Sequence, residues 1–224
     1  MKVGVLQFPG SNCDRDAYHA FHSVLGVPCE LVWHKTETLD SYDLVIVPGG
    51  FSYGDYLRCG AIARFSPVMK ALQNFAAEGG AVVGICNGFQ ILCEARLLPG
   101  ALIRNDCLEF RCQTQRLEVE DSNEVFNRRE LGESLNIPIA HGEGNYRIEP
   151  DGLAELEANR QVILRYASGN PNGSINNIAG IRNRVGNVVG MMPHPERACE
   201  SIHPGTDGLR LLRAFLAMTG SPVA

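Results

Sequence analysis

Six short apolar runs, rich in valine and isoleucine, constrain the fold of this sequence most. They lie at residues 3–6, 31–33, 44–47, 81–85, 162–164 and 188–191. Runs of this length, bounded by glycine, proline or polar residues, are typical of strands buried on both faces of a sheet. Between or after them, apolar residues recur at helical spacing in residues 14–25, 62–77 and 208–218. This alternation predicts an α/β fold with a mostly parallel sheet flanked by helices.

Residues 110–120 interrupt the regular winding, because short apolar or small residues alternate there with longer polar ones. This pattern predicts a few antiparallel strands appended to the parallel sheet. The signals for strands, helices and turns continue without a linker-like break. We therefore expect residues 1–224 to form a single domain.

The composition is that of an ordinary globular protein, with 45% hydrophobic residues, 20% charged residues and a formal charge of -5. Basic residues are not in excess, so the composition predicts neither a nucleic-acid partner nor an anionic membrane. The apolar run at residues 3–6 is too short for a signal peptide or a membrane span. Eight cysteines are scattered through the chain without a targeting segment, which favours reduced thiols in the cytoplasm over disulfides.

The most informative segment is residues 81–92, AVVGICNGFQIL, in which an apolar strand runs through Gly-x-Cys-x-Gly into a helix. The pattern indicates a nucleophile elbow, with Cys86 exposed at the carboxyl edge of the sheet. The first N–H groups of the helix favour a thiolate and can bind an oxyanion. The alternative is a buried structural cysteine. We expect that structural role for Cys93, Cys107 and Cys199.

A second glycine-rich segment, residues 48–55 (PGGFSYGD), also follows an apolar strand. Strand ends of a parallel sheet gather at one edge, so its backbone amides can complete an oxyanion hole beside the elbow. The alternative is an ordinary loop closure, for which Pro-Gly-Gly is common.

Residues 191–197, MMPHPER, end the last apolar run and supply a candidate base. His194 can take the proton of Cys86 and return it to a leaving amine, while Glu196 orients the ring. Most histidines are not catalytic, so an ordinary role stays open. A zinc site is the less favoured alternative, because no close Cys-x-x-Cys or His-Glu-x-x-His pair is present. Its candidate ligands are Cys86, His194, His203 and His141.

Together, residues 48–55, 86–90, 141–144 (HGEG) and 192–197 resemble the class I glutamine amidotransferase family. The resemblance spans nearly the whole chain and implies a flavodoxin-like sheet. It implies that Cys86 attacks the side-chain amide of L-glutamine, that His194 protonates the departing ammonia, and that Glu196 completes a catalytic triad. The backbone N–H groups of Gly50 and Asn87 would form the oxyanion hole, and Gln90 would hold the substrate. Residues 141–144 would lie on the pocket rim or form a plain hairpin turn.

The resemblance also implies that the ammonia passes to a large synthetase subunit, which uses ATP and Mg²⁺, and that many relatives include a third, small subunit. We expect no cofactor and no metal in this chain, which lacks a Gly-x-x-x-x-Gly-Lys-Ser/Thr loop. Two rivals remain, a cysteine peptidase or related hydrolase on the same scaffold and a catalytically silent subunit. Arg58 and Arg64 would meet an acidic partner face or be solvated.

Overall fold

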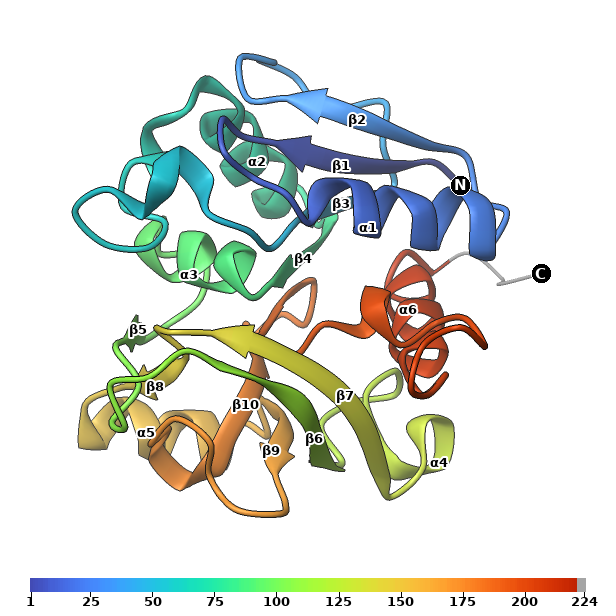
Figure 1. Ribbon diagram of the computed structural model, residues 1–224. Helices are drawn as coiled ribbons and strands as arrows, with labels where there is room; N and C mark the ends of the chain where they lie inside the picture. Colours follow the sequence, from blue (N-terminus) through green and yellow to red (C-terminus); the bar gives the residue numbers. More distant parts are fainter. Residues whose placement is uncertain (221–224) are drawn as a thin grey trace.

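The computed structural model describes residues 1–220, and one nine-stranded sheet forms its centre (Figure 1). The strand order is β2-β1-β3-β4-β11-β10-β9-β6-β7. Parallel pairing joins β2 (Cys29–Trp33), β1 (Val3–Gln7), β3 (Leu44–Val47), β4 (Ala81–Ile85) and β11 (Val188–Met191). Antiparallel pairing adds β10 (Ile178–Arg182), β9 (Val162–Tyr166), β6 (Arg111–Val119) and β7 (Ser134–His141). The α/β fold, with antiparallel strands appended to a parallel sheet, is confirmed.

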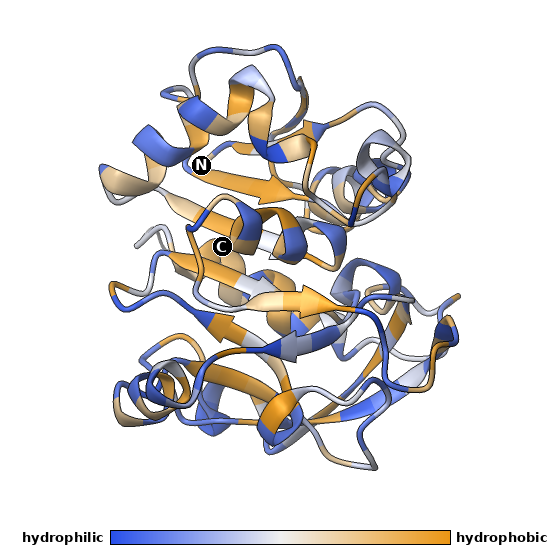
Figure 2. Cartoon of the chain, turned by 90° about the vertical axis from the view of Figure 1, so that its left-hand side faces the viewer, coloured by the Kyte–Doolittle hydropathy of each residue, from blue (hydrophilic) through white to orange (hydrophobic). Residues whose placement is uncertain are grey.

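Six α-helices in the described residues surround this sheet. They are α1 (Asp14–His19), α2 (Pro67–Ala77), α3 (Asn87–Glu94), α4 (Arg128–Leu131), α5 (Pro150–Ala158) and α6 (Gly208–Ala217). A π-helical turn, Ala20–Val24, extends α1 to nearly the full length of the predicted helix. In Figure 1, α1 lies in front of the sheet and α2 behind it. In Figure 2, several strands are mostly hydrophobic, whereas the helices carry both hydrophilic and hydrophobic residues. A small sheet, β5 (Ala101–Ile103) with β8 (Asn145–Arg147), lies beside the main one.

The helix predicted over residues 62–77 is shorter in the structure. It begins at Pro67, and residues Ala63–Phe65 form a separate 3-10 turn. Ser66 between them is extended, with ψ of 144°. The ring of a proline disfavours helical backbone in the residue before it, while its fixed φ suits the first position of a helix. Pro67 therefore starts α2 instead of lying inside a longer helix.

The parallel register places the carboxyl ends of five strands at one edge of the sheet. Val47 of β3 pairs with Gly84 of β4, and Ile85 pairs with Met191 of β11. All residues of β3, β4 and β11 are buried. The loops that leave these ends are therefore held close together by a rigid core. Among the described residues, none of the helices is long and apolar enough to cross a membrane.

Candidate active site

Cys86 occupies the sharp turn between β4 and α3. Its backbone has φ of 51° and ψ of -107°, a conformation that non-glycine residues rarely adopt. The Cys86 N–H donates to the carbonyl of Met191 at 2.7 Å, and the thiol contacts the carbonyl of Ala140 at 3.6 Å. The residue is only 6% exposed, so the expectation of an exposed Cys86 was wrong: neighbouring loops cover this edge of the sheet. Strained backbone of this kind is held by the surrounding structure and is typical of functional sites.

The two glycines that flank Cys86 are required by close packing. A Cβ at Gly84 would lie 2.7 Å from the carbonyl carbon of Gly88. A Cβ at Gly88 would overlap the carbonyl oxygen of Val47 in β3. The Gly-x-Cys-x-Gly spacing thus lets α3 start directly against the sheet and hold Cys86 at the end of its strand.

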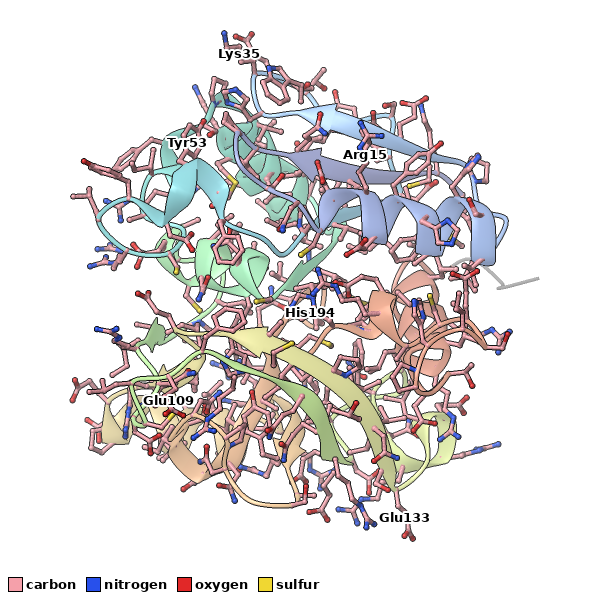
Figure 3. The ribbon with its side chains drawn as sticks, viewed as in Figure 1. Arg15, Lys35, Tyr53, Glu109, Glu133 and His194 are labelled. Atoms are coloured by element: carbon pink, nitrogen blue, oxygen red, sulfur yellow. The ribbon has the colours of Figure 1, made fainter. Side chains whose placement is uncertain are left out.

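His194 and Glu196 follow β11 and are both buried. Nδ1 of His194 lies 2.6 Å from Oε1 of Glu196. The His194 N–H donates to the carbonyl of Pro138 in β7 at 2.8 Å, which fixes the backbone. Figure 3 shows His194 near the centre of the molecule. The ring Nε2 is buried and has no hydrogen-bond partner among the described residues, so it is free to exchange a proton with a reacting group.

The electrostatics of the pair favour a protonated ring. Burial alone would lower the pKa of His194, but the Glu196 carboxylate and the nearby Cys86 sulfur outweigh it and raise that pKa to about 10. At neutral pH the ring therefore carries its proton. The structure thus brings Cys86, His194 and Glu196 together in one buried cluster, as the sequence patterns predict.

The loop after β1 also reaches this cluster, which the sequence patterns did not indicate. A Cβ at Gly49 would lie 2.9 Å from Cε1 of His194 and 3.3 Å from Sγ of Cys13. A Cβ at Gly50, whose φ is +121°, would lie 2.7 Å from the backbone nitrogen of Asn12. The only available signal was positional: residues 8–13 leave the carboxyl end of a buried strand, at the edge where β3, β4 and β11 also end.

Cys13 is itself tied to the segment that carries the pair. Its Sγ accepts a hydrogen bond from a guanidinium nitrogen of Arg197 at 3.1 Å, and Nε of Arg197 donates to Asp16 in α1 at 3.0 Å. Burial, followed by the Glu196 carboxylate, raises the pKa of Cys13 well above its ordinary value. This thiol therefore stays protonated and packs beside the pair as a neutral group.

The first turn of α3 links two loops over the cluster. Asn87 accepts from the N–H of Ser52 at 3.2 Å and donates to Gln90 at 2.9 Å. Nε2 of Gln90 donates to the carbonyl of Glu143 at 2.6 Å, and the carboxylate of Glu143 accepts from the N–H of Cys59 at 3.5 Å. The side chains of Asn87 and Gln90 are therefore occupied by protein partners.

His141 ends β7, next to Ala140, whose carbonyl contacts the Cys86 thiol. It is 2% exposed, and Nδ1 lies 3.2 Å from the side-chain oxygen of Asn105. Burial, and then the neighbouring His194, lowers the pKa of His141 to about 4, so it is neutral at physiological pH. Asn172 donates to the carbonyl of Gly144 at 2.8 Å and completes a buried network under the turn. The turn at residues 141–144 is thus built on a rigid base.

Arg58, Arg64 and Cys107 lie outside this cluster. Nε and a terminal nitrogen of Arg58 donate to the two carboxylate oxygens of Glu94 at 2.7 and 2.8 Å, and Arg64 approaches the same carboxylate at 3.7 Å. Both arginines are thus paired within the chain. Cys107 is only half-buried and contacts Arg111 at 3.3 Å, so the expectation of a buried apolar cysteine was wrong there.

Comparison with known proteins places this chain in a family. Residues 1–206 match the model of the CobB/CobQ-like glutamine amidotransferase domain. The chain is 57% identical over 225 residues to "Phosphoribosylformylglycinamidine synthase subunit PurQ" of Moorella thermoacetica, with 96% of this chain and 95% of the relative covered. It is 59% identical over 217 residues to the protein of the same name from Synechococcus elongatus, with 96% and 98% covered.

Among solved structures, a chain of "Structure of PurLQS from Thermotoga maritima" has a TM-score of 0.85 and 43% identity. The match covers 96% of this chain and 97% of that one. Sequence and structure thus agree over nearly the whole length. This chain belongs to the family of CobB/CobQ-like glutamine amidotransferase domains.

Proposed function

We propose that this chain is the glutaminase subunit of phosphoribosylformylglycinamidine synthase. It hydrolyses L-glutamine to glutamate and ammonia for a synthetase subunit, which converts formylglycinamide ribonucleotide to formylglycinamidine ribonucleotide with ATP in de novo purine biosynthesis. The observation that carries this proposal is the buried pairing of His194 with Glu196 beside Cys86, in a chain 59% identical to a PurQ subunit. A peptidase on the same scaffold has no comparable support.

In the proposed reaction, His194 holds the proton of the Cys86 thiol, so the sulfur attacks the side-chain amide carbon of glutamine as a thiolate and the carbonyl oxygen becomes an oxyanion. The N–H groups of Gly50 and Asn87 would stabilise that charge, since Asn87 begins α3 and its N–H has no partner inside the helix. His194, already protonated, gives its proton to the amide nitrogen, and the C–N bond breaks to release ammonia.

Water then attacks the glutamyl thioester. His194 takes a proton from that water, the C–S bond breaks, and glutamate leaves with the sulfur restored. Glu196 keeps the imidazole in one orientation through both steps. Cys86, His194 and Glu196 are the proposed catalytic residues, and Gly50, Asn87 and Gln90 the proposed substrate-binding residues. These steps use only side chains of this chain and water, without a cofactor or metal. ATP and Mg²⁺ are used by the synthetase subunit.

The proposed partner surface is an apolar rim around the site. The loop at residues 51–66 and the loop at residues 104–110 both contact the turn at residues 141–144. In Figure 3, Tyr53 and Glu109, one from each loop, lie on the same side of the molecule, above and below the level of His194. Six large exposed apolar side chains project from these loops: Phe51, Tyr56, Leu57, Phe65, Leu108 and Phe110.

Exposed apolar patches of this kind are typical of protein–protein contacts. A partner that covers this rim would also keep released ammonia away from water. The synthetase subunit is the proposed occupant, and a small third subunit would join the same complex. We expect weak glutaminase activity in the isolated chain, because the partner would complete the pocket. Eight free thiols fit a cytoplasmic protein.

The test is reconstitution of the complex with Cys86→Ala. The variant should abolish synthesis from glutamine yet leave synthesis from added ammonium at the wild-type rate, because the synthetase chemistry lies on another chain. Loss of both activities would contradict a pure ammonia-donor role. Retained glutamine-dependent synthesis would contradict the role of Cys86.

A further inference from the structure

A cluster of metal-binding side chains lies outside the candidate active site, where the loop after residue 197 meets α1. Sγ of Cys199, a carboxylate oxygen of Glu200 and a ring nitrogen of His203 all lie within 4.8 Å of one another. Nε2 of His19, the last residue of α1, lies 2.8 Å from Oε2 of Glu200. Thiolate sulfur, imidazole nitrogen and carboxylate oxygen are the ligand types that bind Zn²⁺ in proteins.

We propose that Cys199, Glu200, His203 and His19 form a binding site for a divalent cation of the zinc class. Four donors match the coordination number of a closed tetrahedral site. Bonds of about 2.0–2.3 Å to such a cation place its ligand atoms roughly 3.3–3.8 Å apart. Cys199, Glu200 and His203 therefore have to contract by about 1 Å, and the His19 ring has to swing in from its contact with Glu200. These side chains can do so, because those of His19 and Glu200 are 50% and 36% exposed.

The contacts that hold the cluster without a cation are replaceable. Nδ1 of His203 accepts two hydrogen bonds of 3.3 Å from the N–H groups of Cys199 and Glu200, and both are long. The exposed pair of His19 with Glu200 contributes little to stability by itself. A cation exchanges these weak contacts for bonds to sulfur, nitrogen and oxygen. The thiol proton of Cys199 is released to solvent as the metal–sulfur bond forms.

The position of the cluster gives the cation a role in the molecule. The Cys199 thiol now donates to the carbonyl of Glu196 at 3.1 Å, so the same loop carries the carboxylate that orients His194. His19 lies 181 residues from Glu200 in the sequence. A bound cation would thus fasten α1 to the segment behind the candidate active site. Ligand spacing in the sequence did not indicate this site, because its fourth donor comes from a distant element.

The test uses the intact chain and Zn²⁺ alone, in competition with a chromophoric chelator. We expect one equivalent of Zn²⁺ to bind and to raise the thermal unfolding midpoint. His203→Ala and His19→Ala should each weaken binding by about tenfold or more. The matched control is His22→Ala, since His22 follows α1 but stacks on Tyr18 outside the cluster. Co²⁺ in place of Zn²⁺ should give a thiolate charge-transfer band that Cys199→Ser removes.

Two outcomes would overturn the proposal. One is Zn²⁺ affinity that is unchanged by both histidine substitutions. The other is affinity that is lost only with Cys13→Ser, because Cys13, His194 and Glu196 form a second cluster of the same size and the cation would then lie there. Unfolding of each variant without metal shows whether it is folded. The exposed substitution His19→Ala keeps the test decisive if Cys199→Ser does not fold.

Discussion

His194 is buried between Glu196, whose carboxylate lies 2.6 Å from Nδ1, and the Cys86 thiol. The negative charge of that carboxylate is what keeps a buried ring protonated at neutral pH. A protonated ring suits the departure of ammonia, because the leaving nitrogen needs a proton as the C–N bond breaks. Removal of the charge should therefore affect the chemistry more than the fold.

The first prediction is for Glu196→Gln, which keeps a polar group of the same size but loses the charge. We expect kcat for glutamine hydrolysis to fall by about 10²–10⁴-fold, as in other triads that lose their carboxylate. The alkaline limb of the rate profile should also move to lower pH, because the pKa of His194 falls without Glu196. Rates measured across pH in the complex test this. An unmoved alkaline limb would contradict the assignment.

The same ring links stability to pH. The pKa of His194 is raised from 6.5 to about 10 in the folded chain. Its protonation therefore stabilises the fold fully below pH 6.5, and this contribution is lost as the pH rises towards 10. Glu196→Gln should reduce this loss, which urea unfolding at several pH values would reveal.

At the scale of elements, the short strands, the elbow and the final helix were predictable because buried apolar runs and glycine spacing are local signals. β7 was not. Its Pro138 lacks an N–H and argues against a strand. The structure accommodates it because β7 is an edge strand, and the carbonyl of Pro138 accepts the N–H of His194. The role of the loop at Asn12 and Cys13 was not predictable either. Its contacts with Gly49 and Gly50 join segments far apart in the sequence, which a local pattern does not reveal.

The second prediction concerns the junction of β4 with α3. Gly88→Ala places a Cβ against the carbonyl of Val47 and should lower the free energy of unfolding by about 1–3 kcal/mol. Gly205→Ala is the control, because a Cβ there meets nothing within 4 Å. Urea unfolding of both variants measures the difference. Equal stability of the two would mean that the elbow does not depend on this packing.

At the scale of the whole molecule, the nine-stranded sheet extends from β2 to β7 without a break in pairing. We propose that residues 1–224 form one domain. Trp33, the single tryptophan, lies in the edge strand β2. Its fluorescence and far-UV circular dichroism should therefore report the same unfolding midpoint in urea. Two separate transitions would indicate two independently folding units.

A further prediction tests the apolar rim. Leu57→Asp should weaken association with the synthetase subunit by about tenfold or more, because it buries a charge in the proposed contact. Val185→Asp is the matched control, since Leu57 and Val185 are 87% and 82% exposed. Titration of labelled synthetase subunit with each variant measures the affinity. Equal effects of the two substitutions would remove the rim from the interface.

The most direct test of the central claim is covalent labelling of the reconstituted complex with a glutamine-analogue electrophile, followed by mass spectrometry of all eight cysteines. If the buried His194 and Glu196 activate the thiol beside them, Cys86 alone is labelled quickly, glutamine protects it, and His194→Ala slows the labelling. Uniform labelling of exposed cysteines such as Cys112, with Cys86 unmodified, would contradict the account.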